Sequence, residues 1–239
     1  MLVLRVAISI IMLVYTSYFD LRSREVDDKP WIIFSLIGIS ISLYELIFEG
    51  ITSDLIIIPL SVLITTVISF GLYYLGFYGG ADAKALFTLS LVLPLYQPVE
   101  YMHQFAPIMV FTNSLILVLI LPVYYFAKNV YALANGEHLF LGFESEAIWR
   151  KAAVMFMGCR LKKVDIDGFY FSLERTVDGV RRFDLSFSKT GDEFLNARDV
   201  WGTPGIPLLL FMTVGLITLL LFGDLTVQII KLLFALIIN

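Results

Sequence analysis

The sequence of 239 residues contains little cysteine, little histidine and little charge. Its single cysteine, Cys159, excludes an internal disulfide and an all-cysteine metal site. The two histidines, His103 and His138, lack the spacing of metal ligands, so we expect no metal and no cofactor. Only 16% of the residues are charged, and the basic ones form no stripe that could follow nucleic-acid phosphates. Nucleic acid is therefore not an expected partner.

Apolar residues are the most abundant class in the chain. They make up 59% of the chain, and the mean hydropathy is +0.85, above that of a soluble domain of this size. The composition predicts an all-α polytopic membrane protein. About 20 apolar residues cross a bilayer, and five runs approach or reach that length: Leu2–Phe19, Trp31–Phe48, Leu55–Tyr78, Phe105–Ala127 and Gly205–Phe222. No small-x-small cleavage site follows the first run, so we interpret it as a retained span.

A shorter apolar run, Ala83–Leu95, lies between Asp82 and Pro94. We count it as the fourth of six transmembrane helices, although it is short for a span. A further apolar stretch, Leu225–Ile238, follows Gly223 and Asp224. It either extends the last helix or lies at the membrane interface.

Lysine and arginine indicate the orientation in the membrane. They occur in the loop at 20–30, in the turn before the fourth span, and eleven times between Lys128 and Pro204, but not in loops 49–54 and 96–104. The amino terminus is therefore predicted outside, and the basic segments face the cytoplasm. Arg5 and Lys231 are exceptions to the rule.

The long basic segment is predicted to be a small α+β cytoplasmic domain. "ESEAIWRKAAVMFMGCR" has helical spacing of apolar residues, and "VDIDGFYFSLERTVDGVRRFDLSFS" alternates around Asp178 and Gly179 like a β-hairpin. The expected organisation is a membrane domain over 1–127, a cytoplasmic domain over 128–204 and a last transmembrane helix over 205–239.

Four acidic residues lie at or near the ends of predicted spans: Asp20, Glu45, Asp82 and Asp224. Only Asp20 and Asp82 share one side of the membrane. Two carboxyl groups in a low-dielectric setting tend to share one proton. One oxygen can then act as general base toward water while the protonated partner polarises a peptide carbonyl, as in an aspartic protease. Asp20 and Asp82 are therefore the candidate catalytic residues.

The stretch "GFYGGADAKALF" places two glycines before Asp82. Gly79 and Gly80 are expected to take positive φ angles and, with Ala81, to let an extended substrate approach the backbone closely. The segment from Gly76 to Ala81 is expected to be an irregular loop. Asp82 would then begin a helix, whose dipole favours a charged carboxylate.

These segments carry a resemblance. "GGAD" matches a G-x-hydrophobic-D form of the GxGD motif, and the chain resembles the archaeal preflagellin peptidases, relatives of type IV prepilin peptidases and presenilin-like proteases. "FDLRSREVDDKPW" is similar to that family's first catalytic segment, and "WGTPGIPLLLFMTVGL" to the start of its last span. The resemblance implies cleavage of class III signal peptides from archaellins and pilin-like precursors on the cytoplasmic side. It also implies catalysis without N-methylation, because the chain has no CxxC motif.

Two other functions are compatible with the same residues. Asp20 and Asp82 can relay protons in a small ion-coupled transporter whose glycine pair breaks a helix. The absence of a repeated half and the position of the acids at a membrane border disfavour this interpretation. The chain can also be a non-catalytic assembly partner, in which Asp20 only pairs with Arg22 or Arg24 and the glycines only form a turn or a packing site.

Overall fold

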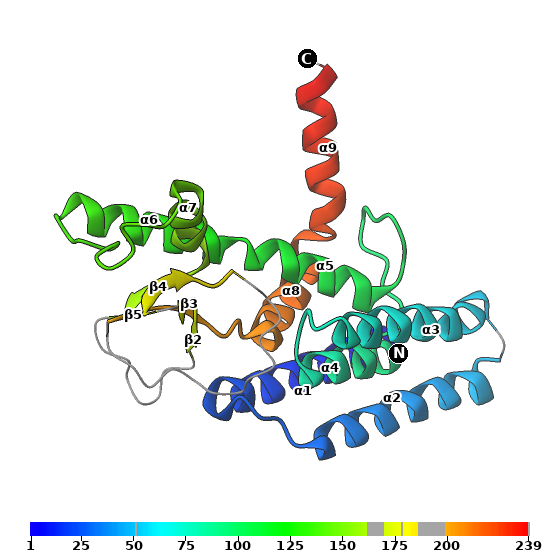
Figure 1. Cartoon of the computed structure of the whole chain (residues 1–239). Coiled ribbons are helices and arrows are strands. Elements are labelled where there is room, and N and C mark those ends of the chain that lie inside the picture. Colours follow the sequence, from blue (N-terminus) through cyan, green and yellow to red (C-terminus); the bar gives the residue numbers. More distant parts are fainter. Residues whose placement is uncertain (51, 162–169, 178, 186–198, 239) are drawn as a thin grey trace. The chain divides into compact units, whose positions relative to one another are not determined.

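The computed structural model describes residues 1–50, 52–161, 170–177, 179–185 and 199–238 (Figure 1). The helices in these ranges are α1 (Leu2–Ser23), α2 (Asp28–Phe48), α3 (Ser53–Tyr74), α4 (Gly80–Val92), α5 (Ala106–Val118), α6 (Ile120–Ala134), α7 (Ile148–Met157), α8 (Leu208–Phe222) and α9 (Leu225–Ile238). The strands are β1 (Cys159–Leu161), β2 (Tyr170–Ser172), β3 (Glu174–Val177), β4 (Val180–Phe183) and β5 (Val200–Pro204).

The chain forms two compact units. Unit 1 comprises Met1–Val118 and Pro207–Asn239, and unit 2 comprises Leu119–Ile206. Unit 2 lies between α5 and α8 in the sequence and contains the small sheet, and it begins within the fifth predicted span. The two units are defined by how the chain packs and not by where a membrane lies. The boundaries of the predicted membrane domain, cytoplasmic domain and last transmembrane helix therefore remain predictions.

Four helices are long and apolar enough to cross a membrane: Leu2–Ser23, Asp28–Phe48, Ser53–Tyr74 and the continuous stretch Ala106–Ala134. A fifth span results if α8 and α9, bent by 63°, are counted together. The predicted total of six is not confirmed among the described residues. The difference comes from α4, whose 13 residues extend only about 20 Å.

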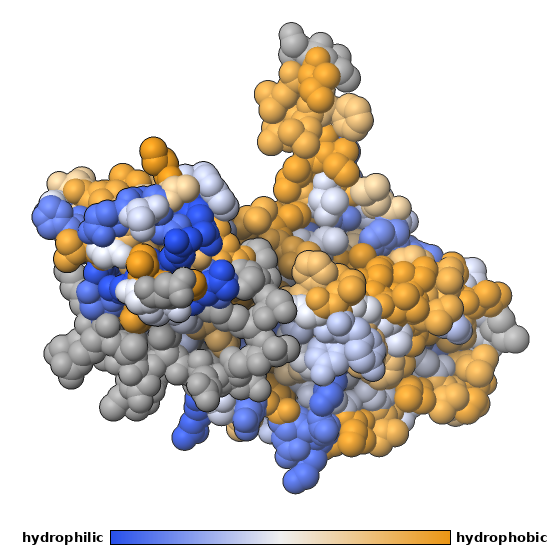
Figure 2. Space-filling model, in the orientation of Figure 1, coloured by the Kyte–Doolittle hydropathy of each residue, from blue (hydrophilic) through white to orange (hydrophobic). Residues whose placement is uncertain are grey.

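Apolar side chains cover much of the outer surface of unit 1. On α2 and α3, exposed residues include Ile33, Leu36, Leu63 and Val67. Figure 2 shows this as broad hydrophobic areas on the visible side of these helices. Because water does not favour such a surface, it is the surface expected of helices surrounded by lipid.

Helix α4 forms the centre of unit 1. It packs against α1, α2, α3, α5 and α8, and several of its side chains are completely buried. One face of α3 presents Ser61, Thr65 and Ser69, all fully buried, toward it. The Ser69 hydroxyl donates to the carbonyl of Ala83 (2.7 Å), and the Ser61 hydroxyl donates to that of Pro94 (2.7 Å). Both ends of the short helix are thereby bonded to α3.

The carboxyl end of α4 also contacts a buried arginine. Arg5 donates from Nη1 to the Val92 carbonyl (3.0 Å), and its Nη2 lies 2.6 Å from Oε2 of Glu45. The last carbonyls of a helix have no partner within the helix, so an arginine at this point satisfies them. This pairing accounts for Arg5 as an exception to the positive-inside rule. Lys231, the other exception, pairs with Glu100.

Unit 2 is built around aromatic side chains. Phe143, Phe183 and Trp201 are fully buried, and Phe143 stacks on Phe183 with ring centroids 4.2 Å apart. A three-stranded antiparallel sheet has the order β1-β5-β2, and β3 pairs with β4 in a separate hairpin. The structure contains the helix and the hairpin predicted from the sequence. Gly179 has φ +75°, whereas Asp178 lies outside the described residues.

The close approach of α2 to α4 yields a test of the packing. A Cβ atom on Gly38 would lie 2.6 Å from the carbonyl carbon of Leu91, which is part of a helix backbone and cannot move aside alone. We expect Gly38→Ala to destabilise the protein by roughly 1–3 kcal/mol. A lowered midpoint of thermal unfolding in detergent would show the effect.

Gly71→Ala is the matched control, since Gly71 also lies within a helix but a Cβ added there would have no atom within 4 Å. Alanine at this position is expected to be neutral or to stabilise by up to about 1 kcal/mol. Equal midpoints for the two variants would contradict the close packing of α2 on α4.

Candidate active site

Asp20 lies in the last turn of α1. The helix ends at Arg24, which has a left-handed backbone (φ 57°) and whose N–H donates to the carbonyl of Asp20 (2.9 Å). This turn brings the guanidinium back over the helix end, with Nη1 3.8 Å from Oδ2 of Asp20. The Asp20 side chain is only 13% exposed. The sequence predicted that Asp20 lies at the end of the first span, and the structure shows in addition that it forms an ion pair with Arg24.

Asp82 is the third residue of α4, which is not among the helices long enough to cross a membrane. Its Oδ2 accepts a hydrogen bond from the N–H of Gly79 (3.2 Å), which precedes the helix. Burial, and after it the negative charge of Asp20, raises the pKa of Asp82 from its ordinary value of 3.8 to about 7. The Gly79 hydrogen bond and the charge of Arg24 act against this rise. Asp82 therefore keeps its proton to about neutral pH.

The two aspartates thus come to the same end of unit 1, close enough to interact electrostatically. Within the described residues, no hydrogen bond joins their carboxyl groups. The other acids at predicted span ends have different partners: Glu45 pairs with Arg5, and Asp224 accepts from the N–H of Thr226 (2.9 Å). Among the four acids selected from the sequence, the structure brings together Asp20 and Asp82.

The loop before Asp82 is irregular over 75–79, but two expectations about it are wrong. Gly80 and Ala81 belong to the first turn of α4 instead of the loop. The positive φ occurs at Gly76 (+77°), while Gly79 is extended at −77°. The reason is that the chain reverses at Gly76, directly after α3 ends at Tyr74 and three residues before Gly79. A single Gly supplies that turn, so the backbone at 79 and 80 has ordinary conformations.

Contacts of Tyr78 and Ser69, which the sequence pattern did not bring to notice, fix this loop. The Tyr78 hydroxyl donates to the carbonyl of Ser69 (2.7 Å), and Ser69 in turn donates to Ala83 next to Asp82. Burial raises the pKa of Tyr78, the side-chain hydroxyl of Ser69 opposes the rise, and the charge of Asp82 adds to it. Ser61, Thr65 and Ser69 recur every four residues in an otherwise apolar span, and this spacing could have indicated a polar helix face that packs inside the protein.

A salt bridge joins the start of α2 to the amino-terminal part of α4. Lys84 contacts the carboxylate of Asp28, and both side chains are well exposed. Exposed pairs contribute little stability, so this contact is a weak link between the two helices. Asp27 forms the cap of α2, where its carboxylate accepts from the N–H of Asp28 (2.7 Å).

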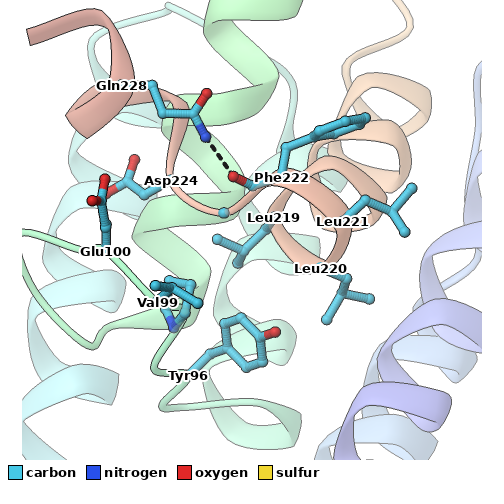
Figure 3. Close-up of a pocket in the computed structure, with 11 residues that line it drawn as sticks. Tyr96, Val99, Glu100, Leu219, Leu220, Leu221, Phe222, Asp224 and Gln228 are labelled. Carbon is cyan, nitrogen blue, oxygen red and sulfur yellow. Dashed lines mark hydrogen bonds between the residues drawn. The ribbon is translucent and has the colours of Figure 1, made fainter. Parts of the chain in front are cut away.

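A cavity lies away from the two aspartates, at the break between α8 and α9 (Figure 3). Tyr96, Glu100, Asp224 and Gln228 line it, and the Gln228 amide donates to the carbonyl of Phe222. Neither candidate catalytic residue contributes to its lining. In the described part of the chain, no group of three histidine, cysteine, aspartate or glutamate side chains is arranged to hold a metal ion.

Comparison with known proteins bears on the whole chain. It is 29% identical to a preflagellin peptidase of Methanococcus voltae, over 91% of this chain and 94% of that protein. Preflagellin peptidases of Methanococcus maripaludis and Methanocaldococcus jannaschii are each 26% identical, over 89% of this chain and 92% and 91% of their own lengths. The resemblance found in the sequence is thereby confirmed.

The match to a family extends over the part of the chain that contains the site. Residues 7–123 match the type IV leader peptidase family. This region runs from α1 to the start of α6 and includes Asp20, the loop before α4 and Asp82. The chain is therefore similar to preflagellin peptidases along nearly its whole length, and its two candidate catalytic aspartates lie in the region that matches the type IV leader peptidases.

Proposed function

We propose that this protein is a membrane aspartyl endopeptidase that removes short, basic class III signal peptides from archaellin and type IV pilin-like precursors. The observation that carries the proposal is the pairing of Asp82, whose pKa is raised to about 7, with the charge of Asp20 at one end of unit 1. The names of the relatives support the substrate class, since they are preflagellin peptidases.

The two carboxyl groups take different roles in this mechanism. Asp20, which forms an ion pair with Arg24, is the base that removes a proton from water, and the water oxygen attacks the scissile carbonyl carbon. Asp82, protonated near neutral pH, donates its proton to the carbonyl oxygen. The tetrahedral intermediate then collapses: the C–N bond breaks as the proton on Asp20 passes to the departing amine, and the C=O bond forms again as one hydroxyl of the intermediate returns its proton to Asp82. No metal or cofactor is required.

The substrate is proposed to lie beside Gly79, Gly80 and Ala81. Two of these residues have no side chain, so an extended peptide can approach the backbone just before Asp82. A Cβ on Gly80 would lie 3.5 Å from the Tyr73 ring, so space for a larger group is limited there. Ordering of the peptide is proposed to bring Asp82 toward Asp20.

Cleavage is proposed to occur at the cytoplasmic face of the cell membrane. The segments next to Asp20 and Asp82 carry Arg22, Arg24 and Lys84, as the positive-inside rule requires of cytoplasmic segments. The two exceptions to that rule, Arg5 and Lys231, both pair with acidic residues. A proton-relay transporter is not favoured, because the relatives are peptidases.

The first prediction concerns the aspartates. Asp20→Asn or Asp82→Asn alone should lower cleavage of a precursor with a class III signal peptide roughly 10²- to 10⁴-fold, because the pair performs one task. The purified protein in detergent would be incubated with the precursor, and the shortened product quantified. The double variant should lose little more activity than either single one.

Asp27→Asn serves as the control, since asparagine also caps a helix and Asp27 lies outside the pair. It should cleave normally. Asp28 is less suitable because of its contact with Lys84. Substantial cleavage by either single-site variant at Asp20 or Asp82 would refute the dyad.

The second prediction concerns pH. The raised pKa of Asp82 means that its carboxyl group is protonated below about pH 7 and ionised above it. Because the mechanism needs that proton, kcat/KM should fall above about pH 7, approaching about tenfold for each pH unit. Initial rates between about pH 5 and 9 would measure the profile. Activity that is unchanged up to about pH 9 would exclude Asp82 as the acid.

The third prediction concerns the glycine pair. Gly80→Val should lower cleavage strongly, since the branched side chain occupies the space beside Tyr73 that we assign to the peptide. Gly80→Ala adds a Cβ at an ordinary contact distance and should retain much more activity. Gly71→Val provides the same change away from the site. Wild-type rates for Gly80→Val would show that the peptide lies elsewhere.

A further inference from the structure

Helix α7 of unit 2 has an apolar face that the described protein leaves open. Ile148, Trp149, Ala152 and Phe156 lie within one arc of about 100° around the helix, given 3.6 residues per turn. Ile148 is 85% exposed, Trp149 66% and Phe156 42%. The opposite side of the helix buries Val154 in the core of unit 2. An exposed arc without a polar side chain indicates contact with something other than water.

The charged residues of α7 are engaged by unit 2, although the Arg150 guanidinium also lies 5.7 Å from the centre of the Trp149 ring, at the edge of this face. Arg150 donates to the carbonyl of Phe183 and lies 3.5 Å from Glu146, and Lys151 donates to the carbonyl of Glu144 (3.3 Å). Both cations are therefore engaged by unit 2 itself. The open face itself consists of apolar side chains, and the one cation at its edge, Arg150, already pairs with Glu146, so the face suits an apolar partner with polar groups at its border.

The apolar face continues onto α6. Phe156 stacks on Phe126 with ring centroids 4.3 Å apart and planes 7° apart, and both rings remain partly exposed. Phe126 belongs to the stretch Ala106–Ala134, which is long and apolar enough to cross a membrane. Its neighbours Val123 and Tyr124 are 64% and 55% exposed. Whatever surrounds the exposed side of α6 around Phe126 therefore also contacts Phe156.

We propose that α7 lies on the membrane surface, with Trp149 and Phe156 in the boundary between lipid head groups and acyl chains. Tryptophan and tyrosine favour this zone, and Phe126 lies next to Lys128, where the apolar part of the stretch ends. Amphipathic helices bind membranes in the same way, with the apolar face in the lipid. This inference does not depend on the proposed catalytic activity.

Tryptophan fluorescence tests the proposal directly. The full-length protein would be reconstituted in phospholipid vesicles whose acyl chains are brominated at one of several depths, and compared with Trp149→Phe. The exposed position of Trp149 allows this change without disturbing the core, whereas Trp31 and Trp201 are buried. The difference between wild type and variant isolates the emission of Trp149. We expect shallow bromines to quench that emission and aqueous iodide to leave it largely unchanged.

A charge on the same face gives a second, independent measurement. Ala152→Asp puts a carboxylate into the apolar arc and should weaken quenching of Trp149 by brominated lipid while increasing quenching by iodide. Thr176→Asp, at an exposed position of β3, is the matched control and should change neither. Quenching by iodide but not by bromine in the wild type would overturn the proposal. Protection from both quenchers would also overturn it, since a protein surface would then cover the face.

Discussion

The ends of α4 have to find hydrogen-bond partners inside the protein. The helix is too short to cross a bilayer, and Val92 and Leu93 at its carboxyl end are fully buried. An unpaired peptide group in such surroundings costs several kcal/mol. At the carboxyl end Arg5 of α1 donates to the Val92 carbonyl, and the serines of α3 add bonds to the carbonyls of Ala83 and Pro94, so α1 and α3 are both bonded to the segment of the central helix. The arrangement of unit 1 follows from satisfying those few groups.

The same constraint shapes the candidate site. The amino end of α4 is capped by the side chain of Asp82 itself, through the N–H of Gly79. The carboxyl group is therefore held at a fixed point of a buried helix, where desolvation opposes its ionisation. Asp20 sits at the end of a different helix and is held by Arg24. The two carboxyl groups therefore belong to different helices and face one another only through the packing of α1 against α4.

Several features could be predicted from the residues because they depend on local pattern. Apolar length located the candidate spans, alternation located the hairpin of β3 and β4, and proline marked the start of α8. The glycine pair illustrates where local reasoning failed. Two adjacent glycines suggested positive φ angles, but the turn needs only Gly76, and its position depends on where α3 ends. The helix ends there because Gly76 is left-handed and lets the N–H of Phe77 donate to the carbonyl of Leu72 (3.0 Å), and the bonds of Tyr78 and Ser69 then fix the loop.

The sequence by itself determined that the chain is a membrane protein, that Asp20 and Asp82 end up at one side, and that a small α+β segment precedes the last helices. These properties follow from hydropathy, span length and charge, which act over short stretches of chain. Only the tertiary structure decided that Arg5, an exception to the positive-inside rule, is paired with Glu45, and that burial sets the protonation of Asp82. Such properties depend on desolvation and on partners from distant helices, which no local pattern encodes.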